Sequence, residues 1–129
     1  ENWLAANLKQ ARDLGLRYGS GGELQPDELD CIFSRWIEEE VPKEDDDLIA
    51  NSLGAAFGNW LVQEHDFKWV VVEDREFGSE YGVRHNLRET IAYPRASVHK
   101  RIEKGESDFF ANIYLMILNQ LQNSKESDQ

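Results

Sequence analysis

Apolar residues recur at helical spacing through the first half of the chain, most clearly between residues 26 and 37. Pro26 suits the first turn of a helix, where the missing amide proton needs no partner. Two further helices are predicted, one over residues 2–16 and one beginning near residue 45. The apolar residues that share one face of the clearest helix are Leu29, Ile32, Phe33, Trp36 and Ile37.

The helix expected from residue 45 carries two glycines, Gly54 and Gly58, near its apolar face. A glycine inside a helix costs about 1 kcal/mol relative to alanine. The pair therefore indicates that another backbone or a strand packs closely against this helix. Close packing is favoured over a ligand site, because nothing polar converges nearby. The residues that this helix is expected to bury are Ile49, Leu53, Ala56, Phe57, Trp60 and Leu61.

From residue 67 the apolar pattern changes to one that predicts β-strands. Residues 67–74 are β-branched and aromatic, and apolar on both faces at their centre, which is typical of an interior strand. Residues 80–85 alternate, residues 90–93 form a third short strand, and a turn is expected over residues 75–78. The most economical arrangement is an antiparallel meander of three strands.

Two helices are predicted after the strands. The first passes through Val98 and Ile102 and ends at Gly105, which is suited to a left-handed cap. The second is capped by Ser107 and buries one side that includes Phe110. The predicted fold class is therefore α+β, with N-terminal helices, a small three-stranded antiparallel meander and two C-terminal helices. Residues 1–122 are expected to form a single domain and residues 123–129 a solvated tail.

The negative charge of the chain lies almost entirely in its first half. Residues 1–66 contain 15 acidic and five basic residues, and residues 67–129 contain 10 and nine, for a net charge of −11. Such a surface repels nucleic acid and anionic membranes, so neither is an expected partner. Solubility alone is the favoured explanation of the charge, with a basic protein or a cation as alternatives.

Two further features point to a cytoplasmic protein. No stretch approaches the roughly 18 apolar residues of a membrane span. The single cysteine, Cys31, cannot form an internal disulfide, which fits a reducing compartment.

The first group of candidate binding residues is an acidic run, Glu44, Asp45, Asp46 and Asp47, at the expected start of the third helix. Consecutive residues there point in different directions, and the glycine and terminal glutamate of a calcium loop are missing. The favoured explanation is that these carboxylates complement the helix dipole. The three histidines lack the spacing of metal ligands, so no metal site and no cofactor is expected.

The second group lies in a basic segment over residues 84–101. Arginine presents a fork of donors that matches carboxylate or phosphate, so these side chains could gather around a small anion or an acidic partner. The favoured alternative is that they cap a helix and pair with the acidic half of their own chain. The candidates are Arg84, His85, Arg95, Lys100 and Arg101, with Arg88 and His99 beside them.

No catalytic residues are assigned, and the sequence favours a protein without enzyme activity. The best enzyme candidate is a group of carboxylates, Glu73, Asp74 and Glu76, at the end of the first strand. Adjacent strand residues face opposite sides, so a surface turn is the favoured explanation.

A helix with the pattern Leu-Gly-x-x-Phe-Gly is followed by Trp, Asp and Gly, then by Tyr-Pro and Lys-Arg-x-Glu-x-Gly-Glu. In order, these are Leu53, Gly54, Phe57, Gly58, Trp69, Asp74, Gly78, Tyr93, Pro94, Lys100, Arg101, Glu103, Gly105 and Glu106. The set resembles a family of small bacterial proteins that carry a domain of unknown function, the DUF3806 type. The resemblance covers about residues 29–121. It implies a fold and a bacterial origin, but no established activity and no catalytic residues.

Two functions remain open. The first is a non-catalytic protein-interaction module whose acidic face, residues 23–47, binds a basic protein; its sharper form is an immunity or antitoxin-like inhibitor of a cationic toxin. The second is a small-molecule or anion-binding domain, or a weak enzyme, with a pocket formed by Trp69, Tyr81 and the basic segment. Homodimerisation through an exposed sheet edge or the last helix is compatible with either.

Overall fold

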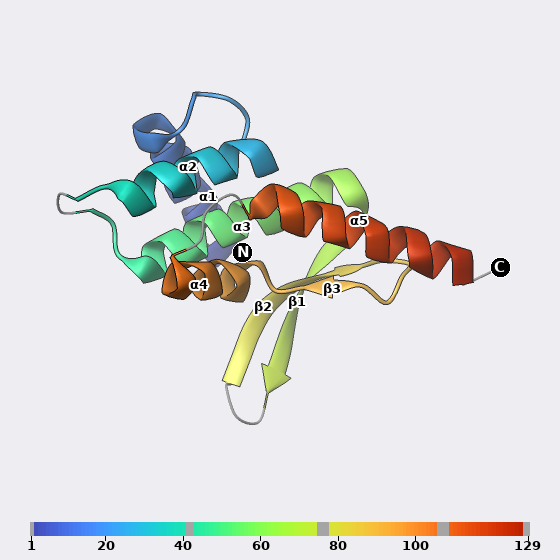
Figure 1. Cartoon of the computed structure of the whole chain (residues 1–129). Coiled ribbons are helices and arrows are strands. Elements are labelled where there is room, and N and C mark those ends of the chain that lie inside the picture. Colours follow the sequence, from blue (N-terminus) through green and yellow to red (C-terminus); the bar gives the residue numbers. More distant parts are fainter. Residues whose placement is uncertain (1, 41–42, 75–77, 106–108, 128–129) are drawn as a thin grey trace.

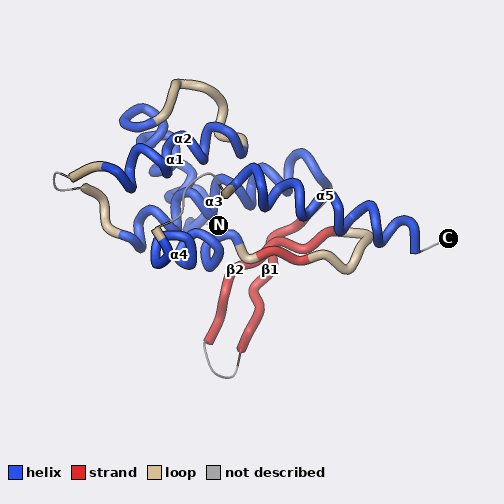
Figure 2. The backbone as a smooth tube through the Cα atoms, viewed as in Figure 1, coloured by secondary structure: helices blue, strands red, loops and turns tan. Residues whose placement is uncertain are grey.

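The computed structural model describes residues 2–40, 43–74, 78–105 and 109–127. The helices gather on one side of a small sheet, and a β-hairpin projects from the other side (Figures 1 and 2). This α+β architecture confirms the predicted fold class. Its elements are α1 (Asn2–Tyr18), α2 (Pro26–Glu38), α3 (Asp46–His65), β1 (Phe67–Asp74), β2 (Gly78–His85), β3 (Ile91–Ala92), α4 (Pro94–Lys104) and α5 (Phe110–Ser127).

The sheet is an antiparallel meander in the order β1-β2-β3. β1 and β2 pair along their full length, whereas β3 pairs only with Val83 and Arg84. The prediction of an interior strand at residues 67–74 is wrong, because β2 is the strand with a neighbour on both sides. The apolar run of β1 is only partly covered: Phe67 is buried, but the side chain of Val71 is 59% exposed. The turn expected before Gly78 lies outside the described residues.

The core lies between the helices and the near face of the sheet. The apolar stripe predicted on α2 is buried, apart from the half-buried Ile37, and the stripe predicted on α3 is buried apart from the half-buried Trp60. α1 continues past the expected end at Leu16 and adds Leu14 and Tyr18 to the core. The largest fully buried side chains include Trp36, Phe33, Phe57, Phe110, Leu29, Ile32, Ile49, Leu53 and Leu61.

Both glycines of α3 lie where another part of the chain approaches, as predicted. A Cβ atom at Gly54 would lie 2.8 Å from the backbone nitrogen and Cα of Arg95, at the start of α4. At Gly58 a Cβ would collide with the indole ring of Trp69 on β1. α3 therefore packs against a helix end and a strand at distances that a larger residue would prevent.

The helix ends show which side chains hold the elements in place. Gly105 has a φ of 66° and ends α4 as predicted. The cap expected from Ser107 lies outside the described residues, but the buried Asp30 on α2 accepts hydrogen bonds from the backbone N–H groups of Phe110 (2.7 Å) and Ala111 (3.0 Å). α2 thus fixes the start of α5, whose backbone stays helical to Ser127, within the region predicted to be a tail.

Candidate functional site

The first member of the acidic run, Glu44, binds groups of its own chain. Its carboxylate accepts hydrogen bonds from the hydroxyl of Tyr18 (2.8 Å) and from Arg17 Nη1 (3.2 Å). Its backbone carbonyl accepts one from the Trp36 indole at 3.0 Å. Burial of the phenol, reinforced by the adjacent Glu44 carboxylate, raises the pKa of Tyr18 to about 12. Glu44 therefore joins the α2–α3 connection to the end of α1.

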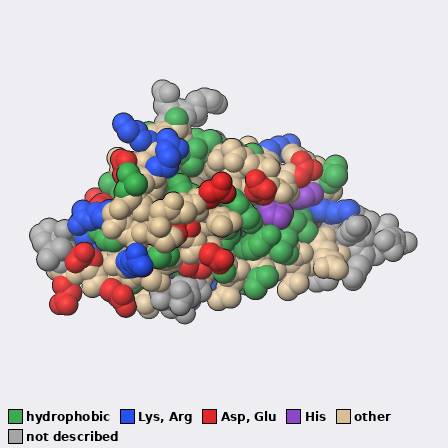
Figure 3. Space-filling model, turned by 90° about the horizontal axis from the view of Figure 1, so that it is seen from above, with side chains coloured by type: hydrophobic (Ala, Val, Ile, Leu, Met, Phe, Trp, Pro, Cys, Tyr) green, Lys and Arg blue, Asp and Glu red, His purple; other side chains and the backbone are tan. Residues whose placement is uncertain are grey.

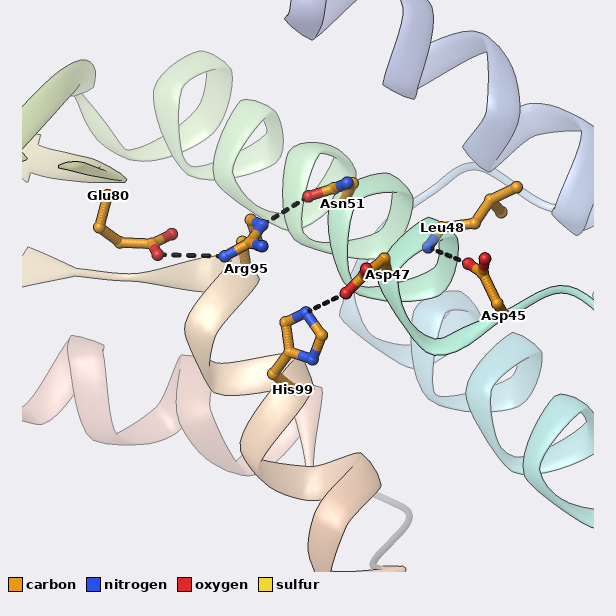
Figure 4. Close-up of polar contacts among 7 residues, drawn as sticks. All are labelled: Asp45, Asp47, Leu48, Asn51, Glu80, Arg95 and His99. Atoms are coloured by element: carbon orange, nitrogen blue, oxygen red, sulfur yellow. Dashed lines mark hydrogen bonds and ion pairs between the residues drawn. The ribbon is translucent and has the colours of Figure 1, made fainter. Parts of the chain in front are cut away.

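The other three acids of the run differ from one another. Asp45 caps α3 by accepting a hydrogen bond from the Leu48 N–H at 2.9 Å (Figure 4), as the helix-dipole explanation requires. Asp47 contacts His99 Nε2 on α4 at 3.1 Å (Figure 4). Asp46 is exposed. The structure thus places the four carboxylates in four different environments rather than around one ligand.

A ladder of polar contacts joins α3 to α4 and then to β2 (Figure 4). Arg95 Nε donates to Asn51 Oδ1 at 2.6 Å, and Arg95 Nη1 lies 3.2 Å from Glu80 Oε1. Asp47 and Asn51 are four residues apart on α3, as are Arg95 and His99 on α4, so each pair shares one helix face. The close approach at Gly54 brings the two faces together. Of the sequence candidates, the ladder therefore brings together Asp47 from the acidic run and Arg95 from the basic segment, with His99 beside them, and each is bound within the chain.

The remaining basic candidates are dispersed. Arg84 is exposed on β2, and His85 Nδ1 accepts hydrogen bonds from the backbone N–H groups of Leu87 and Arg88, which shapes the loop after β2. Lys100 and Arg101 both line a hollow of about 290 Å³ between α4, β3 and α5. The other residues around this hollow are mostly apolar, and include Ile91, Ile113, Met116 and Ile117, with Ser97 and Tyr93 adding hydroxyls.

The two aromatic residues of the predicted pocket lie elsewhere. Trp69 and Tyr81 line a separate hollow of about 420 Å³ with Trp3, Leu4, Val70 and Val71. Trp3 from α1 stacks on Tyr81, with ring centroids 4.2 Å apart, and meets Trp69 edge to face at 5.9 Å. Among the described residues, Trp69, Tyr81 and the basic segment therefore do not line one cavity.

A cluster of acids that we call the acidic tip surrounds the α2–α3 connection. Its members are Glu38, Glu39, Glu40, Asp45 and Asp46. Seen from above, acidic side chains crowd this end of the molecule, whereas acidic and basic side chains are interspersed over the rest of that face (Figure 3). The ammonium of the neighbouring Lys43 points back to α2, where it contacts the carbonyls of Trp36 (2.9 Å) and Ile37 (3.3 Å).

Several polar contacts in the structure have no counterpart in the sequence pattern. The buried Glu28 accepts hydrogen bonds from the Ser20 backbone N–H (2.8 Å) and hydroxyl (2.6 Å), which fixes the glycine-rich loop. His65 packs against the rings of Trp60 and Tyr114, which also contact each other, and this burial lowers the pKa of His65. The periodicity of the sequence predicted that Trp60 would be buried. It did not indicate that His65 would pack against this ring or that Glu28 would bind Ser20.

Neither a cluster of metal-ligating side chains nor a membrane-spanning helix occurs among the described residues. They contain no group of three or more His, Cys, Asp or Glu side chains placed to hold a metal ion. Within the same residues, no helix combines the length and hydrophobicity needed to cross a membrane.

Helices packed on one side of a three-stranded meander, with α3 and α4 joined by polar contacts, define a small α+β domain. The model of one family, described as a domain of unknown function (DUF3806), matches residues 30–114, and the chain belongs to this family. The match includes the whole α3–α4 ladder and the sheet, whereas α1 precedes it. No curated protein and no solved structure matches the chain.

Proposed function

We propose that this protein is a non-catalytic protein-interaction module whose acidic tip binds a basic protein. The observation that carries the proposal is the position of Glu38, Glu39 and Glu40 at the C-terminal end of α2. Carboxylates are unfavourable there because the end of a helix dipole is negative. Asp45 and Asp46 follow closely in the chain but stabilise the start of α3, so the unfavourable charges are those of the three glutamates. A cluster that lowers stability is more readily explained by binding than by folding.

The environment of the tip supports the same proposal. Within the described residues, the side chains of Glu38, Glu40 and Asp46 make no hydrogen bond or ion pair, unlike those of Glu44, Asp45 and Asp47. The Lys43 ammonium donates hydrogen bonds to carbonyl groups of α2 rather than to these carboxylates. The tip therefore presents negative charge to solvent, which accelerates association with a basic surface. The sharper form of the proposal is an immunity or antitoxin-like inhibitor that covers a cationic toxin.

The test compares two triple variants of equal net charge. One neutralises Glu38→Gln, Glu40→Gln and Asp46→Asn in the tip. The control neutralises three exposed acids elsewhere, Asp13→Asn, Glu64→Gln and Glu103→Gln. A basic protein captured from lysate at low salt is purified, and its binding to each variant is measured by surface plasmon resonance.

We expect the tip variant to bind at least about tenfold more weakly and the control to bind like the native chain. The association rate of the native chain should also fall as salt rises from 50 to 500 mM, because screening removes the steering. Equal binding by the tip variant and the native chain, or an association rate that does not change with salt concentration, would exclude the acidic tip as the docking site.

A second candidate function rests on the hollow lined by Lys100 and Arg101. Two cationic side chains over apolar walls suit an amphipathic anion, such as a carboxylate with a short alkyl chain. Octanoate should then raise the melting temperature of the native chain and have a smaller effect on Lys100→Gln. An equal shift in both proteins, or none in either, would remove this candidate.

A further inference from the structure

The hairpin of β1 and β2 extends beyond the rest of the sheet. β3 pairs only with Val83 and Arg84, so from Gly82 to the tip the sheet is a ribbon of two strands. Figure 1 shows this ribbon projecting away from the helices. A two-stranded ribbon is marginally stable in water unless another surface supports it.

The hydrogen bonds at the base of the hairpin show which backbone groups of β1 face outward. The Asn86 N–H donates to the Asp66 carbonyl (3.0 Å), and the His85 N–H donates to Thr90 on the opposite side (2.9 Å). Backbone groups of successive residues in a strand point to opposite sides. Continuing this alternation along the register, Lys68, Val70 and Val72 bond to β2. Trp69, Val71 and Glu73 therefore direct their N–H and C=O groups to the outer edge.

This outer edge has the features of a pairing site. Within the described residues, β2 is the only strand that pairs with β1, and no other backbone segment bonds to the outward groups. The register is continuous, without a bulge, and the centre of the strand is three valines without charge or proline. Natural edge strands usually carry a bulge, a charged residue or a proline that prevents pairing with another strand. Val71 is 59% exposed and borders the hollow formed with Trp3 and Tyr81.

We propose that a second copy of this chain pairs with this edge, β1 against β1 in antiparallel orientation, with the two-fold axis at Val71. The outward residues Trp69, Val71 and Glu73 then meet Glu73, Val71 and Trp69 of the other copy, which allows about six backbone hydrogen bonds. The two three-stranded sheets become one sheet of six strands. The interface is the same patch on both copies, as a symmetric dimer requires.

The charges along β1 favour pairing with a second copy of the chain, in antiparallel orientation. The valine centre is flanked by Lys68 at one end and Glu73 at the other, and both side chains are exposed. With the two-fold axis at Val71, antiparallel pairing places Lys68 of one strand opposite Asp74 of the other, whereas parallel pairing in register would align like charges. The two Val71 side chains meet at the centre, and their exposed apolar surface leaves water.

The first experiment measures the mass of the chain in solution by analytical ultracentrifugation between 5 and 500 µM. Val71→Lys places a charge on the symmetry axis, and we expect it to raise the dimer dissociation constant at least about tenfold. Met116→Lys is the matched control, since Met116 is equally exposed, at 59%, but lies on α5. A native chain that stays monomeric at 500 µM would overturn the proposal. A dimer abolished by Met116→Lys and kept by Val71→Lys would place the interface on α5 and also overturn it.

A second measurement on the native chain does not depend on the folding of a variant. Amide exchange is followed by NMR at low and high protein concentration. The Trp69, Val71 and Glu73 amides should become protected only at high concentration, whereas those of Val70 and Val72 should be protected at both. Edge amides that exchange equally fast at both concentrations would exclude the pairing.

The effect of salt on association distinguishes the proposed dimer from the proposed binding of a basic protein to the acidic tip. Each copy has a net charge of −11, and this repulsion between copies outweighs the attraction between the few opposite charges along β1, so added salt should weaken the net repulsion and tighten the dimer. Binding of a basic protein to the tip should weaken under the same change. A dimer that dissociates as salt rises would contradict edge pairing, and would leave the test of the acidic tip unaffected.

Discussion

The close approach between α3 and the start of α4 predicts a large effect of one methyl group. In Gly54→Ala, the new Cβ would lie 2.8 Å from the nitrogen and Cα of Arg95 and 3.1 Å from the carbonyl carbon of Pro94. These are backbone atoms, and Arg95 is held in addition by its contacts with Asn51 and Glu80. The strain therefore cannot be relieved by rotating a flexible side chain.

The magnitude follows from two opposing terms. Overpacking a well-packed site costs about 1–3 kcal/mol, and contact with backbone places this case near the upper end. Replacing a helical glycine with alanine returns about 1 kcal/mol through helix propensity. We expect a net loss of about 2 kcal/mol in the free energy of unfolding, or about 5–10 °C in melting temperature for a chain of this size.

Gly15→Ala is the matched control, because it makes the same substitution at a buried position inside a helix, α1. A Cβ there would lie 3.6 Å from Leu24 Cδ2 and 3.8 Å from Ile32 Cδ1, which is ordinary van der Waals contact. This variant should gain about 0.5–1 kcal/mol, and urea unfolding followed by circular dichroism measures both changes. If Gly54→Ala were as stable as the native chain while Gly15→Ala was stabilised, the tight packing of α3 on α4 would be refuted.

Three further predictions concern single polar groups. Asp30→Ala removes the acceptor for the first amides of α5 and should lower stability by about 1–2 kcal/mol in urea unfolding, with Asp30→Asn losing less. The pKa of Tyr18, raised to about 12, favours the neutral phenol in the folded state, so stability should fall by about 2 kcal/mol between pH 10 and pH 12; Tyr18→Phe should lack this decline. Burial lowers the pKa of His65, so stability should be lost as the pH falls below the unfolded value of about 6.5 and through the folded pKa, a loss that His65→Gln should not show.

The elements that the sequence predicted well are those set by local periodicity. The stripe from Leu29 to Trp36 is buried on α2, α3 begins at Asp45 and α4 ends at Gly105, as expected. These features depend on residues within one or two turns of each other. The same holds for Gly54 and Gly58, whose cost inside a helix indicated close neighbours without identifying them.

The features that sequence reasoning missed depend on contacts between distant segments. Asp30 caps a helix that begins 80 residues later, and Glu44 binds Tyr18 of α1. Nothing in local spacing says which carboxylate of an acidic half meets which donor. The position of β1 at the sheet edge was missed for a related reason. A continuous apolar run occurs both in an interior strand and in an edge strand whose outer side can pair with another strand.

The two proposed surfaces, the acidic tip and the outer edge of β1, lie apart, so both can be engaged at the same time. Figure 1 places the α2–α3 connection, and with it the acidic tip, away from the β1–β2 hairpin. A dimer formed through β1 would therefore leave both tips free and present two negative surfaces to one basic target. Linking two sites raises apparent affinity for a target that offers two matching sites, without any new contact. Val71→Lys should then weaken binding to a densely immobilised basic partner while leaving one-to-one binding in solution unchanged. Equal losses in both formats would mean that the hairpin itself touches the partner.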